Sequence, residues 1–286
     1  MKQRLLITIG CSFTEGEGCW DMNLKYPKNF SNKHNSNYYF KQLNKSNFHA
    51  NGWPNKLGKK LGFDKVINLG LGGASTSSNI KYFFKYIVDI DFSEYEVSII
   101  WLITDSYRIS IIKDGVINSV NPSGTLEEKE LYNSVYKFVS QNGFRSEMET
   151  LFDYISEEYL SRKILKSLCK DRGWNFVSFH LHANDYSNIL QHQIYGDDKT
   201  HCFTQLAHFE ETSANRKKYI SPFCGHFNEL GYELMSQDMY EFIKRNHNYM
   251  IGNSKSNIDW VYLGNGKLLD NNVIIKLNNI EWNLLS

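Results

Sequence analysis

The chain has 286 residues, of which 41% are hydrophobic and 22% are charged, as is typical of a globular protein with a sizeable core. Its formal net charge of +1 provides no general attraction for nucleic acids or acidic membranes. No apolar run is long enough for a membrane span or a secretory signal. We therefore expect a cytoplasmic protein with neither a nucleic-acid nor a membrane partner, although a protein of a phage particle would have the same composition.

The first strong signal is an apolar run at residues 4–9, which ends at Gly10 and is soon followed by Ser12. Such runs are typical of strands that are covered on both faces in a parallel sheet. Functional groups gather beyond the carboxyl ends of these strands, so Ser12 is a candidate nucleophile. The alternative is that Ser12 only caps a helix. Adjacent side chains point to opposite faces, so Cys11 is expected to face the core.

Residues 20–50 are rich in Asn, Lys, Ser and aromatic side chains and have no sustained periodicity. Their number exceeds that of a simple connection, so we expect an insertion at the edge of the site. The aromatic side chains either attach this insertion to the domain or stack on a carbohydrate. Residues 53–62 then have the pattern of a short helix, with Pro54 in its first turn and Gly62 at its end.

A second strand is predicted at residues 65–69, followed by a glycine-rich loop at residues 70–75 and by a helix. The backbone N–H groups of such a loop are suited to binding an anion. One candidate is the oxyanion of acyl transfer, and the other is the phosphate of a nucleotide. The loop has neither the G-x-G-x-x-G spacing nor a Gly-Lys-Ser/Thr sequence, so a nucleotide-binding flavodoxin-like protein is kept only as an alternative.

A third strand is predicted at residues 97–103, and it leads directly into Thr104, Asp105 and Arg108. Because parallel strands end at the same edge of a sheet, these side chains are expected near Ser12. Asp105 and Arg108 are candidate substrate-binding residues. A surface ion pair is the alternative role of Arg108.

The second half of the chain continues the alternation of helices and strands. Turn residues within 113–125 favour a hairpin or an excursion, and residues 127–139 and 146–169 have helical spacing. A fourth strand is predicted at residues 174–182.

No metal or cofactor is predicted. His180 and His182 share a strand face near Asp185, and His201 and His208 follow, but no His-Glu-x-x-His or comparable ligand set is present. The five cysteines are scattered without a Cys-x-x-Cys pair, so free thiols are expected.

The last informative stretch, residues 221–232, opens a helix with an apolar stripe. A histidine just before this closing helix can reach back to the serine at the end of the first strand. His226 is therefore a candidate general base.

Three segments resemble the sequence blocks of the SGNH/GDSL hydrolases, which are serine esterases and sugar O-acylesterases on a flavodoxin-like α/β/α fold. Residues 10–16 (Gly-Cys-Ser-Phe-Thr-Glu-Gly) are similar to the nucleophile block of that family. Residues 68–75 are similar to its second block, and residues 225–231 (Gly-His-Phe-Asn-Glu-Leu-Gly) to its final block. The three segments occur in the family's order and at predicted strand ends.

The resemblance implies that Ser12 is the nucleophile, that His226 is the base, and that the N–H groups of Ser12 and Gly73 hold the oxyanion. The family's third block supplies an asparagine to the oxyanion hole, whereas this chain has Thr104 there. The Thr104 hydroxyl is expected to donate the remaining hydrogen bond. Loss of one oxyanion donor typically costs about 100- to 1000-fold in turnover.

The acid that precedes the family's histidine is also absent, because Phe223 and Cys224 occupy the candidate positions. A Ser12–His226 dyad remains functional if a backbone carbonyl, or a distant carboxylate such as Asp185, orients the imidazole. These differences favour a slow enzyme or a descendant that only binds.

We thus expect a flavodoxin-like three-layer α/β/α sandwich with a parallel sheet over residues 1–248 and a small β appendage over residues 249–286. The predicted function is that of a serine hydrolase acting on carboxylic esters, with O-acyl groups of a glycan as the substrate class. The alternative is a catalytically weak or inactive glycan-binding or virion-associated module. The sequence leaves open whether the appendage packs on the domain or mediates assembly.

Overall fold

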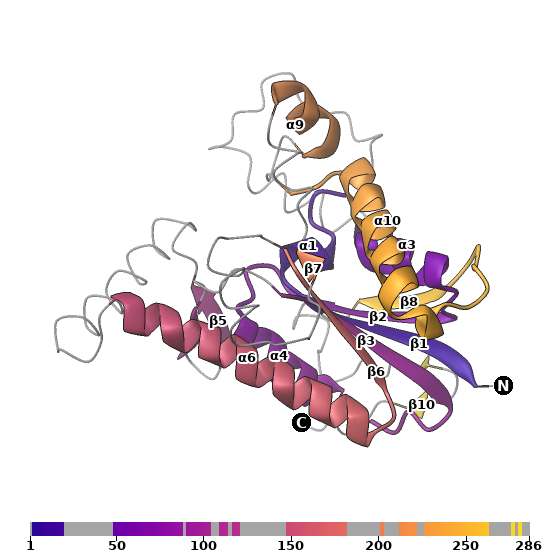
Figure 1. Ribbon diagram of the computed structural model, residues 1–286, viewed down its shortest axis with the longest axis horizontal. Helices are drawn as coiled ribbons and strands as arrows, with labels where there is room; N and C mark the ends of the chain where they lie inside the picture. Colours follow the sequence, from indigo (N-terminus) through magenta and orange to yellow (C-terminus); the bar gives the residue numbers. More distant parts are fainter. Residues whose placement is uncertain are drawn as a thin grey trace.

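Among the described residues of the computed structural model, six parallel strands form the central sheet (Figure 1). In order across the sheet they are β7 (His201–Cys202), β6 (Asn175–His180), β3 (Tyr95–Ile103), β1 (Gln3–Gly10), β2 (Lys65–Gly70) and β8 (Asp259–Tyr262). Apart from the edge strand β8, this is the strand order of flavodoxin-like folds. The predicted fold class is therefore confirmed.

The structure describes residues 2–19, 48–87, 90–103, 109–113, 116–120, 147–181, 201–202, 212–221, 226–262, 276–277 and 280–281. The predicted helix at residues 127–139 and the predicted insertion, apart from its last residues, lie outside these ranges. The predicted turn at residues 114–115 is flanked by an antiparallel pair, β4 (Ile109–Lys113) and β5 (Val116–Val120).

Two helices within the described ranges cover each face of the sheet, which gives the three layers seen in Figure 1. One face carries α3 (Trp53–Leu61) and α10 (Glu229–Asn246), and the other carries α4 (Thr76–Tyr86) and α6 (Glu147–Asp171). The shorter elements are α1 (Ser12–Glu15), α9 (Ser213–Tyr219), η1 (Phe48–Asn51), η2 (Asn248–Met250), β9 (Lys276–Leu277) and β10 (Ile280–Glu281). None of the described helices is long and apolar enough to cross a membrane.

The sequence of β1 is almost continuously apolar because both faces of this strand are buried. Leu6 packs into the core beneath α3 and α10, whereas Leu5 and Ile7 pack into the core beneath α4. All three side chains are inaccessible to solvent. Each buried aliphatic side chain contributes roughly 1.5–3 kcal/mol, so the double-sided burial favours a central position for this strand.

The first strand of the predicted C-terminal appendage belongs to the main sheet. β8 pairs in parallel with β2, from Lys65 opposite Asp259 to Asn68 opposite Tyr262. It covers backbone groups that would otherwise form an open edge of β2. Residues 259–262 thus pack on the domain, which answers the question that the sequence left open for this strand.

Helices α3 and α10 are joined by ion pairs on their outer sides. Lys56 Nζ lies 3.2 Å from Glu233 Oε2, and Lys60 Nζ lies 2.8 Å from Glu233 Oε1. Burial raises the pKa of Glu233, but the hydrogen bonds from Lys60 and Lys56 together with their positive charges outweigh it and leave the pKa lowered. These contacts fix α10, and therefore the segment that precedes it, relative to α3.

His49 connects η1 to the short helix α1. Its Nδ1 donates a hydrogen bond to the carbonyl oxygen of Glu15, at 2.9 Å. Burial lowers the pKa of His49 to about 4, although the bond to Glu15 opposes this decrease. The folded protein therefore holds a neutral imidazole at pH values where the unfolded chain binds a proton.

We expect acid to destabilise the protein through His49. Between pH 6.5 and about 4 the unfolded state binds more protons than the folded state, so the free energy of unfolding falls as the pH falls. Urea denaturation at pH 7 and pH 4.5 should show that His49→Gln loses ~2 kcal/mol less than the wild type over this interval. An equal loss in both proteins would contradict the assignment.

Candidate active site

Ser12 lies beyond the carboxyl end of β1. After β1 the chain adds β2 on one side of it and then β3 on the other, so the order of the strands reverses between β1 and β3. β1 ends at Gly10, and α1 begins at Ser12 after a single extended residue, Cys11. Cys11 is fully buried in the core beneath α3 and α10, as the alternation of side chains predicts. Ser12 itself is 3% exposed and is the first residue of its helix. This edge of an open α/β sheet is where ligands commonly bind.

Asn68 attaches α1 to the end of β2. Its side-chain amide donates to the carbonyl oxygen of Thr14 at 2.8 Å, and its Oδ1 accepts from the N–H of Gly70 at 2.8 Å. α1 passes so close to β2 that a Cβ atom on Gly70 would lie 2.2 Å from the backbone nitrogen of Glu15. The short helix that carries Ser12 is thereby held against β2.

His226 lies beside a short antiparallel contact that precedes α10. Ile220 and Phe227 form a β-bridge, and the N–H of Ser221 donates to the carbonyl oxygen of His226 at 2.7 Å. Asn228 then caps α10 by accepting a hydrogen bond from the N–H of Gly231 at 3.0 Å. The backbone of His226 is therefore fixed on the side that leads into the helix.

The structure brings Ser12 and His226 together although they are 214 positions apart. Ser12 Oγ lies 2.6 Å from His226 Nε2, and the imidazole packs against the ring of Phe13 at a centroid distance of 4.6 Å. If the hydroxyl donates to Nε2, the neutral imidazole carries its proton on Nδ1. This is the geometry in which a histidine can remove the proton of a serine.

Glu17 is a third polar side chain at this position, and the sequence motifs do not indicate it. Its Oε2 lies 3.6 Å from His226 Nε2, and its side chain is 27% exposed, against 17% for His226. The only sequence signal is its place, two positions after the helix that carries Ser12. The position of Glu17 in the sequence does not indicate whether its carboxylate points toward His226 or toward solvent.

The close approach of Glu17 and His226 depends on Gly18. Gly18 has a φ of +96°, and a Cβ atom there would lie 2.3 Å from the carbonyl oxygen of Phe227 and 3.1 Å from His226 Cβ. Both the left-handed backbone and the lack of a side chain are therefore required at this position.

The glycine-rich loop after β2 borders the same edge of the sheet. The N–H of Leu71 donates to the carbonyl oxygen of Gly10 at 3.0 Å, which joins the loop to the end of β1. Gly73 has a φ of +74°, and no atom of the described residues lies within 4 Å of where its Cβ would be. Ser75 caps α4 by accepting from the N–H of Ser78 at 3.1 Å. Among the described residues, nothing fills the space in front of Gly73.

Three predicted site residues cannot be compared with the structure. Thr104, Asp105 and Arg108 lie outside the described residues, directly after β3, which ends at Ile103. Asp185, the distant carboxylate considered for orienting His226, also lies outside them.

His180 is engaged in a buried polar cluster. Its Nε2 lies 3.3 Å from Glu158 Oε1, and Arg162 Nε donates to Ser178 Oγ at 2.9 Å. Burial lowers the pKa of His180, Glu158 raises it and Arg162 lowers it, with a net decrease. No group of three potential metal ligands is found among the described residues, and His182 lies outside them.

The side chains of three cysteines are described, and each of them is buried and forms no disulfide: Cys11, Cys19 and Cys169. Burial raises the pKa of Cys169 to about 12, so its thiol stays protonated at neutral pH. Cys202 and Cys224 are not among the residues whose side chains are described.

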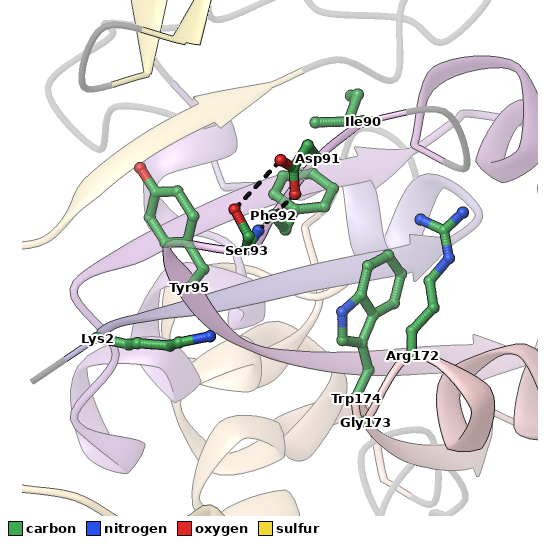
Figure 2. A pocket seen from close by; sticks show the side chains of 9 residues that line it. All are labelled: Lys2, Ile90, Asp91, Phe92, Ser93, Tyr95, Arg172, Gly173 and Trp174. Atoms are coloured by element: carbon green, nitrogen blue, oxygen red, sulfur yellow. Dashed lines mark hydrogen bonds between the residues drawn. The ribbon is translucent and has the colours of Figure 1, made fainter.

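A cavity of about 580 Å³ lies at the opposite end of β3 from Ser12 (Figure 2). Its wall contains aromatic and charged side chains, which already contact one another. Asp91 accepts hydrogen bonds from the N–H and the hydroxyl of Ser93, at 2.8 and 3.2 Å, and Arg172 stacks on Trp174 at 5.1 Å. Neither Ser12 nor His226 lines this cavity, so it is a different place from the candidate active site.

We expect Gly18→Ala to displace the His226 segment. Gly173→Ala is a matched control, because Gly173 also has a positive φ, of +67°, but no atom of the part of the chain that the structure describes lies within 4 Å of its Cβ position. The control should lose ~1–2 kcal/mol of unfolding free energy from backbone strain alone. Gly18→Ala should lose a further ~1–3 kcal/mol from the contact with Phe227. Equal losses in urea denaturation would contradict this packing.

In comparisons with known proteins, no family model matches the chain, and no curated protein matches it.

Proposed function

We propose that the protein is a serine hydrolase that cleaves carboxylic esters, with Ser12 as nucleophile and His226 as general base. The observation that carries the proposal is the 2.6 Å contact between Ser12 Oγ and His226 Nε2 at the carboxyl edge of the sheet. A serine is a weak nucleophile unless a neighbouring base removes its proton, and the imidazole is in hydrogen-bond contact with it.

In the first half of the reaction, Nε2 of His226 takes the proton of Ser12 while Oγ attacks the ester carbonyl. The imidazolium then gives this proton to the leaving alkoxide oxygen, and an acyl-serine remains. In the second half, His226 removes a proton from a water molecule, which attacks the acyl-serine. The carboxylic acid leaves, and Ser12 regains its proton.

The oxyanion of each tetrahedral intermediate needs hydrogen-bond donors, which we assign to the backbone N–H groups of Ser12 and Gly73. Ser12 is the first residue of α1, so helical bonding does not occupy its N–H group. The space that the described residues leave in front of Gly73 is compatible with an approaching substrate. Thr104 is proposed as the third donor, and Asp105 and Arg108 as substrate-binding residues.

The resemblance of the three sequence blocks to SGNH/GDSL hydrolases supports the same reaction and suggests O-acyl groups on a glycan as substrates. The flavodoxin-like strand order agrees with that family's fold. This agreement is necessary but not specific, because one fold serves many reactions. The substrate class therefore rests on the resemblance rather than on the fold.

We expect the protein to hydrolyse p-nitrophenyl acetate in a reaction that requires both residues. Ser12→Ala and His226→Ala should each lower kcat/KM by at least ~10³-fold. The first variant lacks the nucleophile, and the second lacks the base that removes its proton. Ser93→Ala and His247→Gln, which lie at the distant cavity and at the end of α10, are matched controls that should retain activity.

Two further results would decide between the proposal and its alternative. Mass spectrometry after rapid acid quenching should detect acetylated Ser12 in the wild type and no such adduct in Ser12→Ala. Equal residual rates in the wild type and both variants would refute the hydrolase and favour a module that only binds glycans.

A further inference from the structure

Glu17 supplies a negative charge beside His226, a position that the recognised sequence motifs leave unassigned. Its Oε2 is 3.6 Å from Nε2, the same ring nitrogen that contacts Ser12 Oγ. Both side chains are largely shielded from solvent, so water and salt screen their interaction less than that of a surface pair.

The backbone of Glu17 is fixed from two sides. Its N–H donates to the carbonyl oxygen of Ser12 at 3.0 Å, and its own carbonyl oxygen accepts from the hydroxyl of Tyr232 at 2.7 Å. Tyr232 is fully buried in α10, the helix that follows His226. The next residue, Gly18, touches the backbone of Phe227 and allows the two segments to meet. Glu17 is thus tied to the elements that carry both members of the pair.

We infer that Glu17 is a positioning residue that raises the basicity of His226 and stabilises its protonated form. This inference rests on the proposed function, because it concerns the same proton transfer. When the O–H bond of Ser12 breaks and an N–H bond forms at Nε2, the imidazole gains a positive charge next to the ionised Glu17. The carboxylate itself keeps its charge and exchanges no proton.

This role explains how His226 can act although Phe223 and Cys224 stand where a carboxylate is expected before the histidine. A carboxylate within about 4–6 Å of an imidazole typically raises its pKa by one unit or more. The negative charge comes here from the segment that carries the nucleophile. It approaches the ring at Nε2 and therefore acts through charge, whereas a carboxylate bound to Nδ1 would also orient the ring.

Among the described residues, three other titratable groups near His226 do not place a charge beside its Nε2 atom. The carboxylate of Glu15 faces the glycine-rich loop, since a Cβ on Gly72 would lie 2.9 Å from its Oε2. Burial lowers the pKa of His49 to about 4, so His49 carries no charge near neutrality. Glu229 lies 3.5 Å from Lys56, at the start of α10.

The test is a pH titration of the His226 ring by NMR in the full-length protein, together with the pH profile of kcat/KM for p-nitrophenyl acetate. Glu17→Gln, which keeps the shape of the side chain, should lower the pKa of His226 by about 1 pH unit. The acid limb of the profile should move down by the same amount, and the plateau should fall about tenfold. Glu17→Asp should retain most of the wild-type pKa.

Glu229→Gln is the matched control, because it removes the same charge three positions after His226 from a side chain that pairs with Lys56. It should move the His226 pKa by less than about 0.3 pH units. An unchanged His226 pKa in Glu17→Gln, or an increased kcat/KM, would overturn the inference. Absence of turnover that depends on Ser12 would instead refute the proposed function, and the NMR titration would still measure the coupling of Glu17 to His226.

Discussion

The candidate site depends on the close packing of α1 between the ends of two strands and the segment that leads into α10. On one side the Asn68 amide holds the carbonyl oxygen of Thr14, and the backbone of α1 presses against Gly70. On the other side Gly18 meets the backbone of Phe227. These contacts involve backbone atoms, which cannot move aside as flexible side chains can. They determine where Ser12 lies relative to His226.

The topology of the sheet and the packing of its helices explain how Ser12 and His226, far apart in the sequence, reach the same edge. Parallel strands all end at one edge, so the segments after β1 and β2 are neighbours by topology. α10 returns along the same face as α3 and is joined to it by Lys56 and Lys60. The histidine at the start of α10 is therefore brought to the edge by the helix packing.

Much of this arrangement follows from the sequence, because it depends on local patterns. The apolar runs of β1, β2 and β3 predict central strands, and a serine and a histidine beside glycines predict the pair at the edge. Helix α3 follows from Pro54 and Gly62, both of which lie where the pattern predicts.

Other features depend on tertiary contacts that a single sequence does not show. The sequence predicts a β appendage over residues 249–286, but the pairing of residues 259–262 with β2 is decided by the open edge of the sheet. Asn68 was recognisable only as part of a sequence block, and its role as an anchor requires Thr14 to lie above it. Glu17 was missed for a similar reason, because a turn after a four-residue helix can direct a side chain either way.

The exposures of the three polar side chains at the site follow a physical order. Ser12 is 3% exposed as a residue, and the side chains of His226 and Glu17 are 17% and 27% exposed. A neutral hydroxyl can be buried at little cost once it has a hydrogen-bond partner, whereas a buried carboxylate loses several kcal/mol of hydration. A carboxylate at the rim keeps part of its hydration and still lies 3.6 Å from the imidazole. Deeper burial of Glu17 would favour its own protonation, and a neutral carboxyl group would no longer stabilise a positive charge on His226.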